Sequence, residues 1–383
     1  MKVALVILHA DPSRGGAERY TIDLAAALAR RGVDVSLLAT SFAQVPDGVT
    51  QVQLAAPGLT RTARYESMLN ALDAHVFDVA YDIVHAMLPV RGCDVYHPHA
   101  GLALAAVETM SPAKRLLNPR RVRFATVERD RLTKPRPPVV LCLSEYVKRD
   151  VRRLYPNLPD EKLATLFNAV DLDRFDPSRP FAVEAGREDL VFDAKRTIAL
   201  MIAQDFLRKG LRETLEALAQ IEPSQRPALV VVGKGKIGAY QRLARAMRLD
   251  RGRFDRDVFF QGPTAAPDRY YRKADFFVLL TKHDPCSLVV LEALAMGLPV
   301  ISTVFNGATE VMTDGVHGLI LKDPADVDAL ARAMTTLCDD ARRHEMADAC
   351  KTLRPTLAYE HHVDELMAIY RLALARKGIG DRE

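Results

Sequence analysis

DFFVLLTKHDPCSLVVLEALAMGLPVISTVFNGATEVMTDGVHGLIL, residues 275–321, contains the repeating unit of the fold. Its opening run, DFFVLLT, is short and rich in branched and aromatic residues, which is typical of a buried strand. SLVVLEALAMG has the length and composition of a helix, and LPVISTV and GLILK are strand-like again. Strands that alternate with helices in this way predict βαβ units and a parallel sheet.

The same alternation extends over the chain in two series. The first has the strand-like runs KVALVIL, VDVSLLAT, DIVHA, CDVYH and VVLCLS, and ends in the irregular stretch LATLFNAVDLDRFDP. The second begins at RTIALMIA and continues through ALVVVGKG and DVFFQG. We therefore predict an α/β protein of two Rossmann-like, doubly wound domains, residues 1–180 and 190–360, joined by a turn-rich linker near 178–192. The last helix, within 361–383, could pack on either domain.

Length and composition agree with two globular domains, because 383 residues exceed one ordinary core. The five cysteines include no C-x-x-C pair, which favours a reducing cytoplasm over a disulfide framework or a zinc site. No run of about 18 apolar residues could span a bilayer. The short apolar run Val3–Leu8 is better interpreted as a first strand than as a signal peptide. Two doubly wound domains present the carboxyl ends of their strands to ligands, so we expect the site in a cleft between them.

Two carboxylates stand out in residues 282–321. Asp284 follows a strand and Glu292 lies inside the next helix, where its neighbours are apolar. A carboxylate in such surroundings is costly without partners, although a strand-end turn residue and a solvated helix carboxylate are the simpler alternatives. The backbone amides of Ser287, Leu288 and Val289 would stand at the N-terminus of this helix, which suits a diphosphate. Glu292 could then accept hydrogen bonds from a ribose diol.

These residues resemble a known signature. An acidic residue, seven others, a Glu and then ALAMGLPVI are similar to the E-x7-E motif of family 4 glycosyltransferases, which have the GT-B fold. The continuation NGATEVMTDGVHGLIL, with Gly307, Glu310 and the D-G-x-x-G turn from Asp314, is also similar. One position departs from the motif, because the first Glu is here Asp284, which leaves the identity of the sugar open. Within the family, DPCSLVVLE looks closest to the branch around lipopolysaccharide core glucosyltransferases.

The resemblance implies a retaining transfer of a sugar from a nucleoside-diphosphate sugar, with UDP-sugar favoured, to a hydroxyl of a glycan or glycolipid. No metal or other cofactor is implied, and lipopolysaccharide or cell-envelope polysaccharide synthesis is the expected setting. In the family, the residue at Asp284 contacts sugar hydroxyls, and Glu292 would bind the ribose. Two alternatives stay open: a sugar-nucleotide epimerase of the same fold, and a non-catalytic protein that binds nucleotides or carbohydrates.

Two further motifs of the second series are suited to binding the nucleoside-diphosphate sugar. AQDFLRKGL places Arg208 and Lys209 at a helix start, where cations are unfavourable unless they meet an anion such as a diphosphate. VVVGKGKIG contains Gly233, Gly235 and Gly238 in the spelling G-x-G-x-x-G. This is the dinucleotide fingerprint, and by itself it would suggest an NAD enzyme. It follows the second strand of its domain, however, and resembles the family's G-x-G turn beside the nucleotide.

The first domain offers a glycine turn and a histidine loop. Gly15 and Gly16 in SRGGAERY would allow close approach of the backbone to the donor phosphates or the acceptor, or form only a tight connection. In CDVYHPHAG, the family resemblance suggests that His99, with His97 behind it, contacts the donor sugar; a structural histidine is the alternative. Asp94 and the two histidines could also be interpreted as metal ligands, but the extended H-P-H segment makes a metal site less favourable.

A basic segment completes the candidates. Residues 114–136 carry nine cations against two acids, among them Arg120, Arg121 and Arg123. Such a segment could hold a phosphorylated acceptor or dock on an anionic membrane surface, so the protein could be peripheral to a membrane; a solvated basic face is the alternative. Nucleic acid is a poorer partner, because few aromatic residues for stacking lie nearby and the net charge is only +4.

Overall fold

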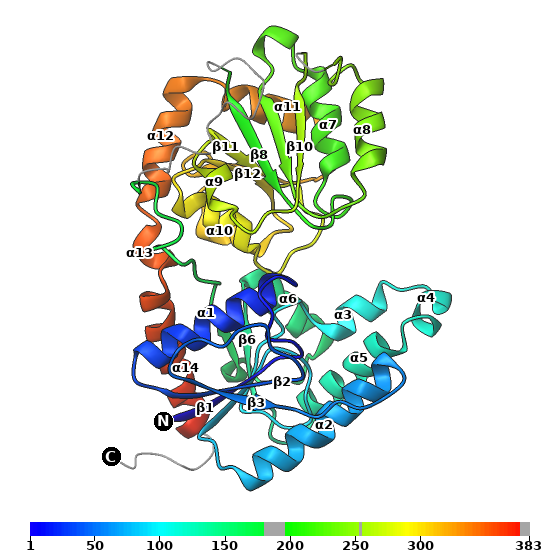
Figure 1. Ribbon diagram of the computed structural model, residues 1–383, viewed down its shortest axis with the longest axis vertical. Coiled ribbons are helices and arrows are strands. Elements are labelled where there is room, and N and C mark those ends of the chain that lie inside the picture. Colours follow the sequence, from blue (N-terminus) through cyan, green and yellow to red (C-terminus); the bar gives the residue numbers. More distant parts are fainter. Residues whose placement is uncertain (180–195, 253–254, 376–383) are drawn as a thin grey trace. The chain divides into compact units, whose positions relative to one another are not determined.

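The computed structural model (Figure 1) describes residues 1–179, 196–252 and 255–375. The chain divides into two compact units, Met1–Ala169 with the segment from Tyr359, and Val170–Ala358. Each unit contains one sheet whose paired strands are parallel, with helices on both faces, so the α/β fold is confirmed. None of the helices in these ranges is long and apolar enough to cross a membrane.

The first unit is built on a seven-stranded sheet in the order β3-β2-β1-β4-β5-β6-β7. Its strands are β1 (Lys2–Val6), β2 (Asp34–Ala39), β3 (Val49–Gln53), β4 (Ile83–Ala86), β5 (Val95–Tyr96), β6 (Val139–Cys142) and β7 (Leu163–Thr165). The central strands β1, β4 and β6 are almost wholly buried, which explains their continuous apolar runs. The strand order reverses between β1 and β4, which makes this the topological switch point of the sheet.

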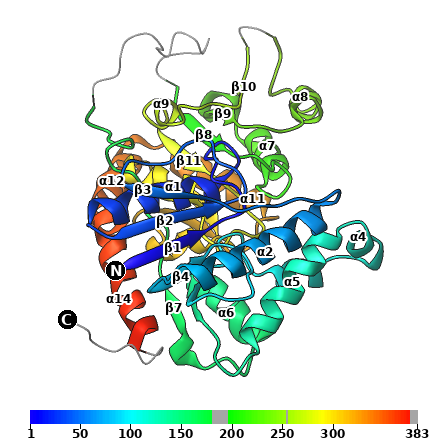
Figure 2. The same ribbon diagram turned by 60° about the horizontal axis from the view of Figure 1, so that its bottom comes forward.

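Helices cover both faces of this sheet. They are α1 (Gly16–Arg30), α2 (Arg61–Asp78), α3 (Ala103–Glu108), α4 (Pro112–Leu116), α5 (Pro119–Leu132), α6 (Glu145–Leu154) and α14 (Tyr359–Ala375). Figures 1 and 2 show α1 and α14 on one face and α2, α5 and α6 on the other. The last helix, α14, packs against α1 and β4 and therefore belongs to the first unit.

The second unit repeats this plan with a six-stranded sheet in the order β10-β9-β8-β11-β12-β13. Its strands are β8 (Ile198–Ile202), β9 (Ala228–Val232), β10 (Val258–Gly262), β11 (Phe276–Val278), β12 (Val300–Thr303) and β13 (Gly318–Leu321). Here the strand order reverses between β8 and β11. Ligands bind outside the carboxyl ends of the strands at such a point in open α/β sheets.

The helices of the second unit stand between and after its strands. They are α7 (Leu211–Gln220), α8 (Ile237–Ala246), α9 (Asp268–Tyr271), α10 (Leu288–Ala295), α11 (Val327–Thr336), α12 (Asp340–Lys351) and α13 (Arg354–Leu357). In Figure 1, α7 and α8 lie on one side of the sheet and α9, α10 and α12 on the other. The helix α10 is apolar nearly all round, and most of its residues are buried, as its sequence indicates.

The structure differs from the sequence-based expectation at two strands and one boundary. The stretch beginning LAT was predicted to be irregular, but Leu163–Thr165 forms β7, and β3 was not predicted at all. Both are edge strands, and they are only three and five residues long. The boundary lies between Ala169 and Val170 rather than near 180, because the Val170 amide donates to the carbonyl of Leu357 in the second unit. Most of the predicted linker (180–195) and the end of the chain (376–383) lie outside the described residues.

Candidate active site

In the second unit, the loops that follow four neighbouring strands form one connected rim. The strands are β9, β8, β11 and β12 in sheet order, and the loops at their carboxyl ends contain residues 233–236, 203–210, 279–287 and 304–307. Gly233 and Gly235 contact the 203–210 loop, that loop is hydrogen-bonded to 279–287, and 279–287 is bonded in turn to 304–307. The rim therefore contains five of the residues that the sequence suggested for donor binding, namely Arg208, Lys209, Gly233, Gly235 and Ser287.

Three contacts join the loop after β8 to the loop after β11. The Lys282 amide donates to the carbonyl of Arg208, 3.0 Å away, and a guanidinium nitrogen of Arg208 donates to the carbonyl of His283 at 2.6 Å. Nζ of Lys209 forms an ion pair with the carboxylate of Asp284. Sequence reasoning assigned Lys209 to a diphosphate and Asp284 to a sugar, and the structure pairs these two side chains with each other.

Lys209 is only 7% exposed, which makes its charge unusual. Burial lowers the pKa of this ammonium group, while the charge of Asp284 opposes that effect. The next residue, Gly210, has a φ of 75° and is the N-cap residue of α7. A Cβ atom at Gly210 would lie 2.5 Å from the Leu280 carbonyl oxygen, so the two loops meet here without space for a side chain. Lys209 is thus held rigidly at the switch point.

Glu292 lies in the second turn of α10 and is half-buried. The hydroxyl of Tyr271 is 2.8 Å from Oε2 of Glu292 and 3.1 Å from the carbonyl oxygen of Val289. Burial, and then the charge of Glu292, raises the pKa of Tyr271, so this hydroxyl keeps its proton and donates the hydrogen bond to Glu292. Tyr271 therefore supplies one of the partners that a carboxylate in an apolar helix needs. Sequence reasoning missed Tyr271, since no spacing in the sequence relates α9 to α10.

The N-terminus of α10 offers fewer amides than the sequence suggested. The Ser287 amide already donates to Oδ1 of Asn306 at 3.2 Å, and Ser287 itself is buried. The amides of Leu288 and Val289 make no hydrogen bond within the described part of the chain. Asn306 is fully buried and also accepts from the Ala308 amide, so it fixes the loop after β12 to the start of α10. In the sequence, Asn306 follows a strand and precedes a glycine, and this position was the signal that could have indicated a capping role.

The two glycines of the G-x-G turn are explained by the close packing of the neighbouring loop after β8. Gly233 has a φ of 143°, and a Cβ atom there would come within 1.7 Å of the Ala203 carbonyl oxygen. A Cβ atom at Gly235 would lie 2.4 Å from the ring of Phe206. Gly238, the third glycine of the spelling, has no such neighbour closer than 3.8 Å. The first two glycines therefore allow the loops after β8 and β9 to pack closely.

In the first unit, the glycine turn follows β1 at the switch point of the sheet. Gly15 is extended, with a φ of 174°, and a Cβ atom there would meet a carboxylate oxygen of Glu18 at 3.1 Å. Gly16 is the first residue of α1. Asp11 holds the preceding turn by accepting hydrogen bonds from the Ser13 amide and hydroxyl. Burial raises the pKa of Glu18 in the first turn of the helix.

His99 belongs to a buried cluster of histidine and tyrosine side chains. Its Nε2 is 2.9 Å from Oδ1 of Asn168, and its ring lies 4.6 Å from the ring of Tyr20, measured between centroids. Tyr20 bonds Nε2 of His362 through its hydroxyl at 2.7 Å. The cluster therefore ties the loop after β5 to α1 and α14, and places His99, which is 8% exposed, at its border.

His97 continues this cluster inward. Its Nδ1 lies 3.2 Å from Nε2 of His85, whose Nδ1 lies 2.7 Å from the hydroxyl of Tyr370. Asp94 is directed elsewhere, because its carboxylate accepts from the Val84 amide at 2.8 Å. Within the described residues, no group of three or more His, Cys, Asp or Glu side chains is arranged to hold a metal ion.

The three arginines of the basic segment lie in the first two turns of α5 and have different surroundings. Arg123 forms an ion pair with Glu66 of α2, whose carboxylate also pairs with Arg91. The guanidinium of Arg120 lies over the ring of Phe124 at 5.6 Å. Arg121 is exposed. Arg120 and Arg121 make no ion pair in the described ranges, so they, and not Arg123, are available to an anion.

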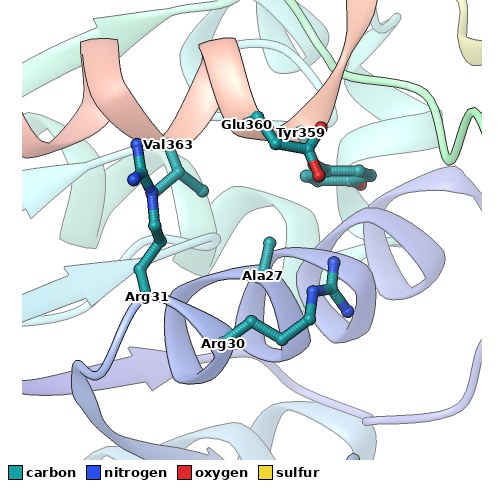
Figure 3. A pocket seen from close by; sticks show the side chains of 6 residues that line it. All are labelled: Ala27, Arg30, Arg31, Tyr359, Glu360 and Val363. Carbon is teal, nitrogen blue, oxygen red and sulfur yellow. The ribbon is translucent and has the colours of Figure 1, made fainter.

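A separate hollow of about 260 Å³ lies between α1 and α14 in the first unit (Figure 3). Ala27, Arg30 and Arg31 line it from α1 and its end, and Tyr359, Glu360 and Val363 from α14. Arg31 is ion-paired with Asp364 of α14. The hollow contains none of the residues that the sequence suggested for binding or catalysis.

Comparison with known proteins agrees with these two units. The family model Glycosyltransferase Family 4 matches residues 14–174, and the model Glycosyl transferases group 1 matches residues 196–340. The D-inositol 3-phosphate glycosyltransferase of Kribbella flavida is 28% identical, and the match covers 97% of this chain and 96% of that protein. The protein of the same name from Nocardiopsis dassonvillei is 25% identical, with 99% and 96% covered.

Solved structures share the fold over the whole chain. WaaG, a glycosyltransferase involved in lipopolysaccharide biosynthesis, is similar with a TM-score of 0.80 at 22% identity, covering 96% of this chain and 99% of that one. HepE from Anabaena, in complex with UDP-glucose, has a TM-score of 0.70 at 17% identity, with 96% and 100% covered. The two sheets, the motif around Glu292 and the two family models lead to one conclusion: the chain is a glycosyltransferase of GT-B fold that belongs to family 4.

Proposed function

We propose that this glycosyltransferase uses a nucleoside-diphosphate sugar, with UDP-sugar favoured, and that the second unit binds it. The observation that carries the proposal is the meeting of Arg208, Lys209 and the Asp284 loop at the switch point of the second sheet. A buried ammonium group and an adjacent guanidinium suit a diphosphate. HepE, which has the same fold, was solved with UDP and with UDP-glucose, and this supports the choice of donor.

Each part of the rim has a role in this proposal. Glu292, oriented by Tyr271, accepts hydrogen bonds from the ribose hydroxyls. Lys209, Arg208 and the amides at the start of α10 hold the diphosphate and stabilise the charge that develops on it as it leaves. In this proposal, Asp284 neutralises Lys209 before the donor binds and then accepts hydrogen bonds from the sugar hydroxyls. Because fixed cations supply the positive charge, we propose that transfer needs no bound metal, and chelation of metals with EDTA should leave the rate unchanged.

We further propose that transfer retains the anomeric configuration. The bond from the anomeric carbon to the donor phosphate breaks while a bond forms to the acceptor oxygen on the same face. The proton of the acceptor hydroxyl passes to the leaving phosphate oxygen. His99 and the Gly15–Gly16 turn are the contribution of the first unit to the sugar and the acceptor. The configuration of the product can be determined by NMR, and an inverted product would contradict this part of the proposal.

The acceptor is proposed to be a hydroxyl of a glycan or glycolipid, in lipopolysaccharide or cell-envelope polysaccharide synthesis. The likeness to WaaG supports this setting. A peripheral position on an anionic membrane is part of the proposal, because Leu116 and Leu117 are 82% and 79% exposed beside Lys114 and Arg115 at α4. Cosedimentation with anionic vesicles tests it. Replacement of both leucines by Ser should weaken binding, and equal binding of wild type and variant would contradict it.

The donor site is tested by ligand-induced changes in melting temperature. UDP-, GDP- and ADP-glucose are each added to the wild type and to the variants Glu292→Gln and Lys209→Met. We expect one donor to raise the melting temperature of the wild type and to have a much smaller effect on either variant. The matched controls are Glu222→Gln, an exposed carboxylate of the same unit, and Lys351→Met on α12.

Three outcomes decide between the functions. A donor that stabilises the two site variants as strongly as the controls would show that the site is elsewhere. Conversion of the donor into an isomeric nucleotide sugar without any acceptor would indicate an epimerase instead of a transferase. Binding without turnover across a panel of acceptors would contradict transfer itself.

A further inference from the structure

We propose that Arg14, Arg61, Arg120 and Arg121 form a binding site for a phosphate group that the acceptor carries. The inference concerns the first unit and rests on the proposed function in one respect, namely that this unit receives the acceptor. These four residues are the arginine cluster.

The cluster stands where cations are least favoured. Arg61 is the first residue of α2, Arg120 and Arg121 are in the first turn of α5, and Arg14 precedes α1 by two residues. The first turns of α2 and α5 contain no acidic residue, whereas the first turn of α1 contains Glu18. A helix N-terminus carries roughly half a positive charge, so a cation there is unfavourable and an anion favourable by about 0.3–1 kcal/mol. An anion held between Arg61 and Arg120 would also lie near the starts of α2 and α5.

The three helices begin at the same edge of the sheet. Each of α1, α2 and α5 precedes a parallel strand of the sheet, and each follows one, so all three start at the carboxyl ends of the strands. The helices α2 and α5 lie side by side, since the rings of Tyr65 and Phe124 are 4.4 Å apart. Figures 1 and 2 both show this pair of helices together. The common edge includes the switch point after β1, where ligands of such sheets bind.

The spacing of residues along α2 and α5 puts Arg61 and Arg120 on the facing sides of these helices. Arg120 lies over Phe124, four residues on, and Arg61 precedes Tyr65 by four residues, which is one turn in each case. Both arginines therefore stand one turn before the contact between Tyr65 and Phe124.

In the described part of the chain, acids near the arginine cluster do not form ion pairs with it: the charge of Arg14 acts to lower the pKa of Asp11 and of Glu18, but Arg14 is paired with neither. Within residues 1–179, 196–252 and 255–375, none of its four members forms an ion pair with an acid, whereas Arg123 of the same helix does. Burial lowers the pKa of Arg120, and the charges of Arg61, Arg121 and Arg14 lower it further. Arg14 and Arg120 also lower the pKa of His9, after burial. Arg14 and Arg61 are therefore each near enough to Arg120 to repel it.

A phosphate group fits this arrangement better than a carboxylate does. It carries up to two negative charges and three terminal oxygens, so several guanidinium groups can each donate two parallel hydrogen bonds. Binding it would replace repulsion among the arginines with attraction and satisfy the helix ends. The phosphate could belong to a soluble ester or to a lipid headgroup, because the recognising chemistry is the same.

The experiment uses the full-length protein and two probes, glycerol 3-phosphate in solution and vesicles that contain phosphatidic acid. Binding is compared for the wild type, the double variant Arg61→Gln/Arg120→Gln, and the control Arg152→Gln, an exposed arginine of α6. UDP is kept saturating so that the second unit does not contribute. We expect the double variant to bind about tenfold more weakly or worse, and the control to match the wild type. Arg120→Lys should have an intermediate affinity, since it keeps the charge and loses the paired donors.

The outcomes distinguish a soluble phosphate from a lipid-borne one. They also distinguish failure of the arginine cluster from failure of the proposed donor site. Arginine-dependent binding of glycerol 3-phosphate supports a soluble phosphorylated acceptor, and arginine-dependent binding of vesicles alone supports a lipid-borne one. Equal binding of both probes by the double variant and the wild type would overturn the inference. UDP-induced stabilisation is measured on the same variants. If UDP stabilises the double variant normally, the donor site is intact and a loss of phosphate binding belongs to the arginine cluster; if UDP fails to stabilise any form, the proposed donor site fails instead.

Discussion

At the scale of single residues, the pairing of Lys209 with Asp284 gives the first prediction. Both side chains are largely buried, with 9% and 13% exposed, so removal of either charge leaves the other without a partner. Such a loss costs about 3–5 kcal/mol when a pair is fully buried. We expect Asp284→Asn to destabilise the second unit by about 2–4 kcal/mol, given this partial exposure. Chemical denaturation of the variant measures the loss.

Two further variants distinguish a charge effect from a packing effect. Asp284→Glu keeps the charge, so it should be more stable than Asp284→Asn. The double variant Lys209→Met/Asp284→Asn removes both charges and should also be more stable than Asp284→Asn alone, since no charge is left buried without a partner. If the loss of unfolding free energy in the double variant equals the sum of the losses in the two single variants, the ion pair does not couple these positions.

Tyr271 gives a second prediction at this scale. Its hydroxyl lies 2.8 Å from Glu292, so Tyr271→Phe removes one hydrogen bond to a charged group while it keeps the ring. A bond of this kind contributes about 1.5–3 kcal/mol. Because Glu292 would then be less firmly oriented toward the ribose, we expect KM for the donor to rise about tenfold, with a smaller change in kcat. Tyr270→Phe is the control. An unchanged KM for Tyr271→Phe would show that Tyr271 has no role in donor binding.

At the scale of elements, the G-x-G-x-x-G motif gives a prediction in which Gly233 is tested and Gly238 serves as the control. Gly233→Ala would place a Cβ atom against the Ala203 carbonyl, at a φ of 143° that side chains rarely adopt. The loops after β8 and β9 would have to separate, and we expect a loss of about 3 kcal/mol or more. Gly238→Ala, near the start of α8, meets no close neighbour and should be neutral or slightly stabilising. Comparable thermal stability of the two variants would contradict this interpretation.

The elements also mark what could be predicted from the sequence. The buried strands and α10 were predictable because they are continuous apolar runs with clear lengths. The edge strand β3 was not, since VTQVQ alternates polar residues and is mostly exposed. In the site, motif residues such as Arg208, Asp284 and Glu292 could be selected by residue type and position. The partners could not, because Lys209 and Asp284 are 75 residues apart in sequence and only the packing of two loops joins them.

At the scale of the whole molecule, the buried histidines predict how stability depends on pH. Burial lowers the pKa of His85 and His362 to about 3, and it lowers the pKa of His97 as well, while the unfolded value is 6.5. Well above pH 6.5 these histidines are neutral in both states, and their contribution to stability is fully present. As the pH falls toward 3, the unfolded chain binds protons that the folded chain excludes, so stability decreases.

The size of this effect follows from the two pKa values. At pH 5, each of His85 and His362 should lower the free energy of unfolding by about 2 kcal/mol relative to pH 7.5. Burial raises the pKa of Glu128, so protonation of this carboxyl acts in the opposite direction to that of the histidines as the pH falls. Calorimetric scans between pH 7.5 and 5 should therefore show the melting temperature of the first unit falling, and NMR should show the buried histidine resonances unchanged over the same range. A melting temperature that is constant in this interval, or a buried histidine that titrates near pH 6, would mean that the cluster around Tyr20 is open to water.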